Sequence, residues 1–145
     1  MAIKNDIYTT YKGKEYRVLY HDGMAKLVSK NAEDLEKEFI EKIYDTKHLK
    51  YTPEDLAEKI YTLIVSPEEV GDVYEIATYA LYQGYEFWIK HESEDTYLLK
   101  GNINTALMEK LDFKRVDKYD YEKRVDKKDV ELVYEKKELI TDFFD

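Results

Sequence analysis

Two stretches of the chain alternate between apolar and polar residues, which is the pattern of a β-strand with one buried face. They cover residues 8–31 and 79–102 and align without a gap at an offset of 71 residues. The identical pairs are Tyr8/Tyr79, Tyr11/Tyr82, Gly13/Gly84, Glu15/Glu86, Leu27/Leu98 and Asn31/Asn102. The match predicts a diverged tandem duplication in which both leucines are buried, and the alternative is coincidental alternation in two ordinary hairpins.

Each stretch is expected to form a β-hairpin around its glycine, because glycine adopts the positive φ of a tight turn at no steric cost. These turns are predicted at Gly13 and Gly84. In the first stretch Asp22-Gly23 marks a second turn, followed by a third strand over residues 24–29. The second stretch carries Glu92-Ser93-Glu94-Asp95 in place of that turn.

Capping residues predict three helices. Asn31 precedes acidic residues and begins a helix over about 32–38. Thr52-Pro53 begins a second, with one apolar face formed by Leu56, Ile60, Leu63 and Ile64. Asp126 begins a third over about 127–137, with one face formed by Val130, Val133 and Tyr134. In the second half, residues 103–111 occupy the place of the first helix.

The remaining segments are less regular. Residues 39–51 suit a hairpin, or the first helix continues to Tyr44, whereas residues 113–125 alternate like a strand or hairpin. Ser66-Pro67 starts a single turn that Gly71 interrupts. The tail, 139–145, adds an edge strand or frays, and its two adjacent phenylalanines favour docking.

These elements predict an α+β fold made of two diverged tandem β-β-β-α-(β)-α repeats that share one core. With 145 residues, of which 43% are hydrophobic, the chain suits a single domain over 1–145, with pseudo-repeats at about 7–71 and 78–145. Only 5 Gly and 2 Pro are present and no stretch is rich in glycine or serine, so no flexible linker is expected.

The net charge of -9 argues against binding to nucleic acid or to anionic membranes and favours encounter with a basic partner, although solubility alone also explains it. The absence of cysteine excludes disulfides and thiolate metal sites. With no apolar leader at the start and no long apolar run, the chain is expected to be cytoplasmic and not to enter a membrane.

No catalytic motif is present, and we expect neither an enzyme nor a metal or other cofactor. The three histidines lack ligand spacing, and no serine lies in a nucleophile elbow. The best enzymatic candidates are the carboxylates Glu15 and Glu86, which recur beside the two glycine turns. Glutamates in such positions are more often cross-strand partners of a lysine or tyrosine.

Tyrosine is unusually frequent, with 15 residues, and suits both half-exposed sheets and recognition surfaces. A small, acidic, cysteine-free chain with YxGxEF-type hairpins at 8–18 and 79–89 resembles the immunity proteins that bacteria make against polymorphic or contact-dependent toxins. That resemblance implies tight binding to a toxin domain and obstruction of its active site. The strand pattern is also similar to small barrel or SH3-like modules, which again implies binding.

We therefore expect a stoichiometric protein-binding inhibitor, namely an immunity protein that neutralises a basic, nuclease-type toxin domain. The alternatives are a small-molecule-binding or enzymatic module with a cleft between the halves, and a regulatory or structural interaction protein. Relative to the first copy, the second replaces Lys14 and Arg17 by aromatic residues and gains acids. The predicted partner-binding residues are therefore Tyr85, Trp88, Glu92, Glu94 and Asp95.

Overall fold

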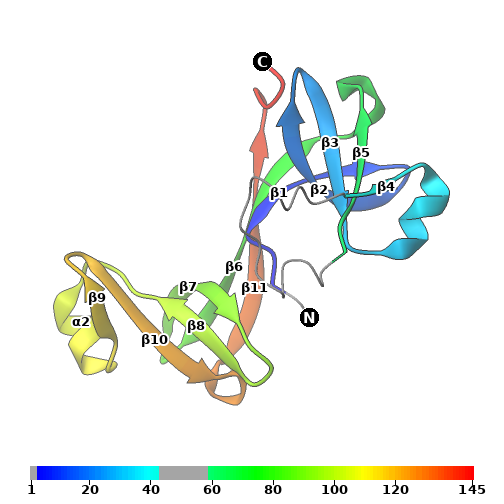
Figure 1. Cartoon of the computed structure of the whole chain (residues 1–145). Helices are drawn as coiled ribbons and strands as arrows, with labels where there is room; N and C mark the ends of the chain where they lie inside the picture. The colour runs from blue at the N-terminus through cyan, green and yellow to red at the C-terminus, as the bar shows by residue number, and fades with distance from the viewer. Residues whose placement is uncertain (1–2, 43–58) are drawn as a thin grey trace, which may run out of the picture. The chain divides into compact units, whose positions relative to one another are not determined.

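The computed structural model describes residues 3–42 and 59–145, and the helix predicted after Thr52 begins outside them. The chain divides into two compact units (Figure 1). The N-terminal unit contains Ile7–Tyr74 and the last residues of the chain, Leu139–Asp145. The C-terminal unit contains Glu75–Glu138 and the first residues, Met1–Asp6.

The N-terminal unit is an antiparallel sheet with strand order β4-β5-β3-β2-β1. Two 3₁₀-helices, η1 and η2, follow β3 and β5. The elements are β1 (Asp6–Tyr11), β2 (Lys14–His21), β3 (Met24–Ser29), η1 (Ala32–Lys37), β4 (Ile40–Glu41), β5 (Tyr61–Val65) and η2 (Pro67–Glu69).

The C-terminal unit repeats this arrangement with strand order β6-β7-β8-β10-β9, and β11 pairs with β6. Helix α2 stands where η1 stands in the other unit. The elements are β6 (Val73–Tyr82), β7 (Tyr85–Glu92), β8 (Thr96–Lys100), α2 (Thr105–Lys110), β9 (Lys114–Asp117), β10 (Asp120–Asp126), η3 (Lys127–Asp129) and β11 (Leu132–Ile140).

The predicted hairpin turns are confirmed. Lys12-Gly13 and Gln83-Gly84 have positive φ at both residues, 48° and 79° in the first and 53° and 81° in the second. Two successive positive φ angles define the turn whose twist matches that of a two-residue β-hairpin. Asp22-Gly23 forms a third turn of this kind, with φ of 48° and 79°.

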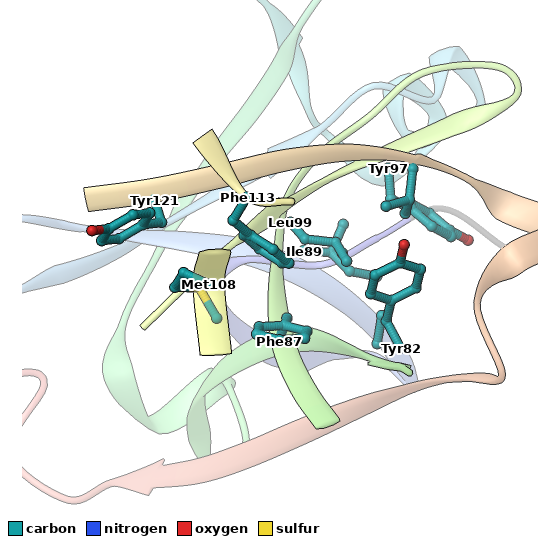
Figure 2. Close-up of a cluster of buried hydrophobic side chains, with 10 residues drawn as sticks. Tyr82, Phe87, Ile89, Tyr97, Leu99, Met108, Phe113 and Tyr121 are labelled. Carbon is teal, nitrogen blue, oxygen red and sulfur yellow. The ribbon is translucent and has the colours of Figure 1, made fainter. Parts of the chain in front are cut away.

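The predicted α+β class is wrong, because 55% of the described residues lie in mostly antiparallel strands and 14% in helices. The predicted shared core is also wrong, because the buried residues form two clusters, one in each unit. One contains the fully buried side chains of Val18, Ala25 and Leu27. The other contains Ile89, Leu99 and Met108, around which aromatic rings gather (Figure 2).

The helix predicted at 127–137 is the clearest local error, because only Lys127–Asp129 is helical and Leu132–Ile140 is strand β11. Val133 packs against the core of the C-terminal unit, whereas Tyr134 stacks on Tyr79 with ring centroids 6.3 Å apart. Pairing with β6 supplies the backbone hydrogen bonds of β11, and this tertiary interaction outweighs the local helical spacing.

The helix face predicted after Thr52 is also wrong where the structure describes it, because Leu63 and Ile64 lie in strand β5. Other local predictions fare better. η1 lies within the predicted 32–38 helix, although it is a 3₁₀-helix, and α2 lies within 103–111. The alternating segment 113–125 forms the hairpin of β9 and β10. The tail docks, because Phe143 and Phe144 pack against the core of the N-terminal unit.

The offset of 71 residues holds only as far as Ile89. Val18 pairs with Leu27, but its counterpart Ile89 pairs with Leu99, because β7 carries a β-bulge between Ile89 and His91. Leu99 is therefore the buried residue, and Leu98, expected in the core, lies on the opposite face and is only half-buried. One extra residue in a strand reverses the faces of the residues that follow it.

Candidate protein-binding surface

The structure separates the two aromatic residues predicted to bind a partner. Tyr85 and Trp88 lie three residues apart on β7, so they face opposite sides of the sheet. Tyr85 is 45% exposed beside the hairpin turn, where it pairs with Tyr82. Trp88 is half-buried, with the Nζ of Lys100 5.8 Å from its ring centroid.

Trp88 also has a structural role within its unit. Its indole N–H donates to Oδ1 of Asn5 at 2.9 Å, and the same oxygen accepts from the backbone N–H of Thr78. The Asn5 amide nitrogen donates to the carbonyl of Ile89 at 2.7 Å. Asn5 thus bridges β6 and β7, and the sequence offered no signal for this contact between residues more than 70 positions apart.

The predicted carboxylates do not surround Trp88. Glu92 follows the bulge and pairs with Tyr97 on the core side, where Lys127 donates to it at 2.8 Å. The hydrogen bond from Lys127 lowers the pKa of Glu92 more than burial raises it. Glu94 and Asp95 are exposed and line a shallow hollow of about 370 Å³ with Asp126, Lys127 and Lys128. The five residues therefore do not form one aromatic anchor ringed by acids.

Glu86, one of the two enzymatic candidates, is held by strand β11. It accepts hydrogen bonds from the hydroxyl of Tyr134 and from the ammonium of Lys136. The lysine and tyrosine together hold the pKa of the Glu86 carboxyl below its usual range, despite some burial. The geometry supports the structural interpretation of this glutamate as a partner of lysine and tyrosine.

A buried carboxylate that the sequence did not single out lies in the N-terminal unit. Asp34 on η1 is 1% exposed and accepts from the Tyr16 hydroxyl at 2.8 Å and from Lys14 Nζ at 3.0 and 3.2 Å. The hydroxyl of Ser29 donates to the same carboxylate. We call these four residues the Asp34 hub. It fastens η1 to β2 and β3.

The hub is a closed network. Burial raises the pKa of Asp34, but hydrogen bonds from Ser29, Tyr16 and Lys14 outweigh it and hold the pKa below its usual range. Burial, reinforced by the neighbouring carboxylate, raises the pKa of the Tyr16 hydroxyl. A carboxylate with both oxygens already hydrogen-bonded is a poor proton acceptor, so the hub is suited to positioning rather than to catalysis.

Outside the hub, η1 and β4 present acids and aliphatic side chains to solvent. We define this acidic edge as Glu33, Leu35, Glu36, Glu38, Ile40 and Glu41, all of them exposed. Leu35 is 46% exposed and Ile40 68%. Within the described residues none of the four glutamates forms an ion pair, and β4 pairs only with β5. The run of acids at 33–41 was visible in the sequence, but its exposure at a sheet edge was not.

The equivalent edge of the C-terminal unit has an excess of cations, because residues 114–120 carry three exposed basic side chains and two exposed acids, Asp117 and Asp120. Strand β9 stands at the end of its sheet, as β4 does. We define this basic edge as Lys114, Arg115, Val116, Lys118 and Tyr119, all exposed, with Tyr119 at 71%. Arg115 donates to the carbonyl oxygens of Asp117 and Lys118, which holds its guanidinium beside the hairpin turn.

The N-terminal unit also has an open hollow of about 600 Å³ beside the hub. It is lined by Tyr8, Lys14, Glu15, Tyr16, Arg17, Val28, Ser29, Lys30, Asn31 and Ala32. Across residues 3–42 and 59–145 no group of three or more histidines or acids is placed to hold a metal ion. No helix in the same ranges is long and apolar enough to cross a membrane.

Comparison with known proteins assigns a family. Residues 3–142 match the family described as "Uncharacterised conserved protein UCP033725". The chain belongs to this family. The family match contains the hub and both edges, so these features lie in the part of the chain that defines membership. No curated protein and no solved structure matches the chain.

Proposed function

We propose that this chain is a stoichiometric inhibitor that binds a basic protein, in the manner of an immunity protein that neutralises a nuclease-type toxin domain in the cytoplasm. The observation that carries the proposal is the acidic edge, where exposed glutamates surround two exposed aliphatic side chains at a sheet margin. A nuclease carries a positive substrate groove, and this surface complements it in charge.

The acidic edge combines the two components of a protein interface. Leu35 and Ile40 offer apolar area that a partner can remove from water, and isolated exposure of such residues would be unremarkable without the charges around them. The glutamates accelerate encounter with a basic surface, which electrostatic steering can bring to about 10⁸ M⁻¹s⁻¹ at low salt. Their negative charge also disfavours binding of nucleic acid to the inhibitor itself.

The Asp34 hub explains how the edge keeps its shape. η1 has only six residues, too few to be stable alone, and its buried aspartate is bonded to side chains of two strands. Three residues beyond η1, Ile40 begins β4. The hub therefore fixes the segment that bears the glutamates, so little conformational entropy would be lost when a partner binds.

The test is charge reversal of the edge, with the product of the neighbouring reading frame as the binding probe. The variant Glu33→Lys/Glu36→Lys/Glu41→Lys should slow association with that protein at least tenfold and weaken its dependence on salt. Growth protection on co-expression should be lost together with binding. Thermal stability should change little, because all three residues are exposed.

The matched control is the equivalent edge of the other unit. Lys114→Glu/Arg115→Glu/Lys118→Glu changes the same number of charges on β9 and its turn, and it should leave association with the neighbouring product unchanged or faster. Equal association rates for wild type and the acidic-edge variant would exclude this surface. If neither the wild-type chain nor the acidic-edge variant binds the neighbouring product, that product is excluded as the partner.

A further inference from the structure

We propose that the acidic edge of one copy pairs with the basic edge of a second copy of this chain. This inference goes beyond the proposed function, because it concerns the protein without its partner. Both edges end an antiparallel sheet of the same strand order, and β4 and β9 follow η1 and α2 at corresponding places. What differs between the two edges is the predominant sign of the exposed charges, with four glutamates on one and three basic side chains beside two aspartates on the other.

The backbone of β4 is oriented for such pairing. Lys42 N–H donates to the carbonyl of Ile60 at 2.7 Å, so residues 42 and 60 form a hydrogen-bonded pair. In an antiparallel ladder the next pair, Glu41 and Tyr61, is then not hydrogen-bonded, and the N–H and C=O of Glu41 point away from β5. Arg115 has the corresponding position opposite Tyr121. These two residues can exchange backbone hydrogen bonds across an interface between copies.

Antiparallel pairing of Glu41 with Arg115 sets the neighbouring contacts. Ile40 then faces Val116, both of them exposed in the single chain, whereas Glu38 and Lys118 lie beyond the ends of the two strands. The parallel arrangement with Ile40 beside Val116 would instead place Glu41 against Asp117, which is repulsive. The antiparallel register has one unfavourable contact, Lys42 with Lys114, against one opposite-charge pair, Glu41 with Arg115, and one apolar pair, each contributing roughly 0.2 to 1 kcal/mol.

The two edges are different surfaces, so the contact is heterologous. After the first contact one chain keeps its basic edge unused and the other keeps its acidic edge unused, so association continues to open-ended oligomers unless the geometry closes a ring. The contact is short, so we expect it to be weak and to form at chain concentrations of about 100 µM or more. A basic partner that binds the acidic edge would compete with this association.

Sedimentation velocity of the full chain tests the proposal. The weight-average sedimentation coefficient should rise with concentration at low salt, and 0.5 M NaCl should suppress the rise. Glu33→Lys/Glu36→Lys/Glu41→Lys and Lys114→Glu/Arg115→Glu/Lys118→Glu should each be monomeric alone. Each has two edges of like charge, but a mixture of the two variants should associate, because the unchanged basic edge of the first meets the unchanged acidic edge of the second and the two reversed edges are also opposite in charge.

The decisive measurement uses a pair of milder variants that remove charge without reversing it, because their mixture has only one complementary contact. Glu38→Gln/Glu41→Gln weakens the acidic edge and leaves the basic edge intact, and Arg115→Gln/Lys118→Gln weakens the basic edge and leaves the acidic edge intact. Each should be monomeric alone, whereas their equimolar mixture should form a 1:1 dimer and no larger species. Association that persists in both single variants, or a mixture that remains monomeric while wild type associates, would overturn the proposal, as would a wild-type chain that stays monomeric at every concentration.

Failure of this proposal leaves the proposed function separately testable. Binding of the neighbouring product is measured at nanomolar concentrations of the chain, far below those at which copies associate. If the chain does not self-associate but still binds its partner, only the pairing between copies is refuted. If the chain self-associates but does not bind the neighbouring product, only the proposed inhibitor function is refuted.

Discussion

Asp34 stands in the N-terminal unit where Met108 stands in the C-terminal unit. The backbone N–H of Phe39 donates to the carbonyl of Asp34 at 3.3 Å, and that of Phe113 donates to the carbonyl of Met108 at 2.9 Å. Both side chains are buried beneath a short helix. One unit therefore places a charge where the other places a thioether.

The neighbours of these two residues differ in the same sense. Tyr16, which donates to Asp34, corresponds to Phe87, and the ring of each packs against the phenylalanine that follows the helix, with centroids 5.0 and 4.7 Å apart. Ser29, the other hydroxyl donor, corresponds to Gly101. The two units thus stabilise the same helix position by a polar network and by an apolar cluster.

Removing the charge of the hub alone should be costly. Asp34→Asn weakens two buried hydroxyl contacts and removes the anionic partner of Lys14, which is 39% exposed, so we expect a loss of about 1.5 to 3 kcal/mol in the free energy of unfolding. This loss is measured by urea denaturation, with hydrogen exchange of amides in the N-terminal unit as the probe of unfolding. The matched control is Met108→Leu, which conserves volume in the other unit and should cost less than about 1.5 kcal/mol.

Replacing the three buried residues of the hub together should cost less than breaking the hub at Asp34. Tyr16→Phe/Ser29→Gly/Asp34→Met gives the N-terminal unit the residues of the C-terminal unit, and a buried ionic network can often be exchanged for packed apolar groups with little loss. We expect the triple variant to be more stable than Asp34→Asn in the same urea titration. A triple variant less stable than the single one would show that the hub stabilises this unit in a way that packing cannot replace.

Acid should weaken the N-terminal unit through Asp34. Because the pKa of Asp34 is lower in the folded state, its stabilising contribution is complete above the pKa of the unfolded chain, near 4. The contribution is lost as the pH falls from about 4 through the folded pKa. A plot of unfolding free energy against pH should therefore slope upward with pH below about 4 and be flatter in Asp34→Asn. Identical slopes in the two proteins would contradict the assignment.

The side chain of Asn5 should contribute strongly to the stability of the C-terminal unit, because it makes three hydrogen bonds. Asn5→Ala removes the partner of the Thr78 N–H, the Ile89 carbonyl and the Trp88 indole together, and we expect a cost of about 2 to 3 kcal/mol. Trp88 is the only tryptophan, so its fluorescence reports unfolding of this unit. Asn102→Ala, at an exposed turn amide, is the control and should cost about 1 kcal/mol or less.

A methyl group at Gly101 should disrupt the same unit for a steric reason. A Cβ there would lie 2.4 Å from Sδ of Met108 and 2.8 Å from Cβ of Tyr121. Gly101→Ala should therefore destabilise the unit by about 1 to 3 kcal/mol, because the core must shift to admit the methyl. Tryptophan fluorescence in urea measures the change. An unaltered denaturation midpoint would show that the core tolerates the extra volume.

The chain itself determined the turns and the strands beside them. Lys12-Gly13, Asp22-Gly23 and Gln83-Gly84 form the hairpin turns that their glycines predict, and the flanking alternation becomes paired strands. These features depend on contacts between residues close in sequence and on backbone conformations that glycine adopts most readily. Local chemistry was sufficient for them.

Only the tertiary structure decided which residues share a face and which helices form. Because of the bulge after Ile89, Leu99 and not Leu98 lies in the core, and Glu92 lies on the face of the sheet opposite Trp88. Pairing with β6 makes Leu132–Ile140 a strand. The exposure of the acidic edge likewise depends on Asp34 meeting Tyr16 and Ser29 from other elements. Such outcomes depend on hydrogen bonds and packing between distant segments, whose free energies exceed local preferences that amount to tenths of a kcal/mol per residue.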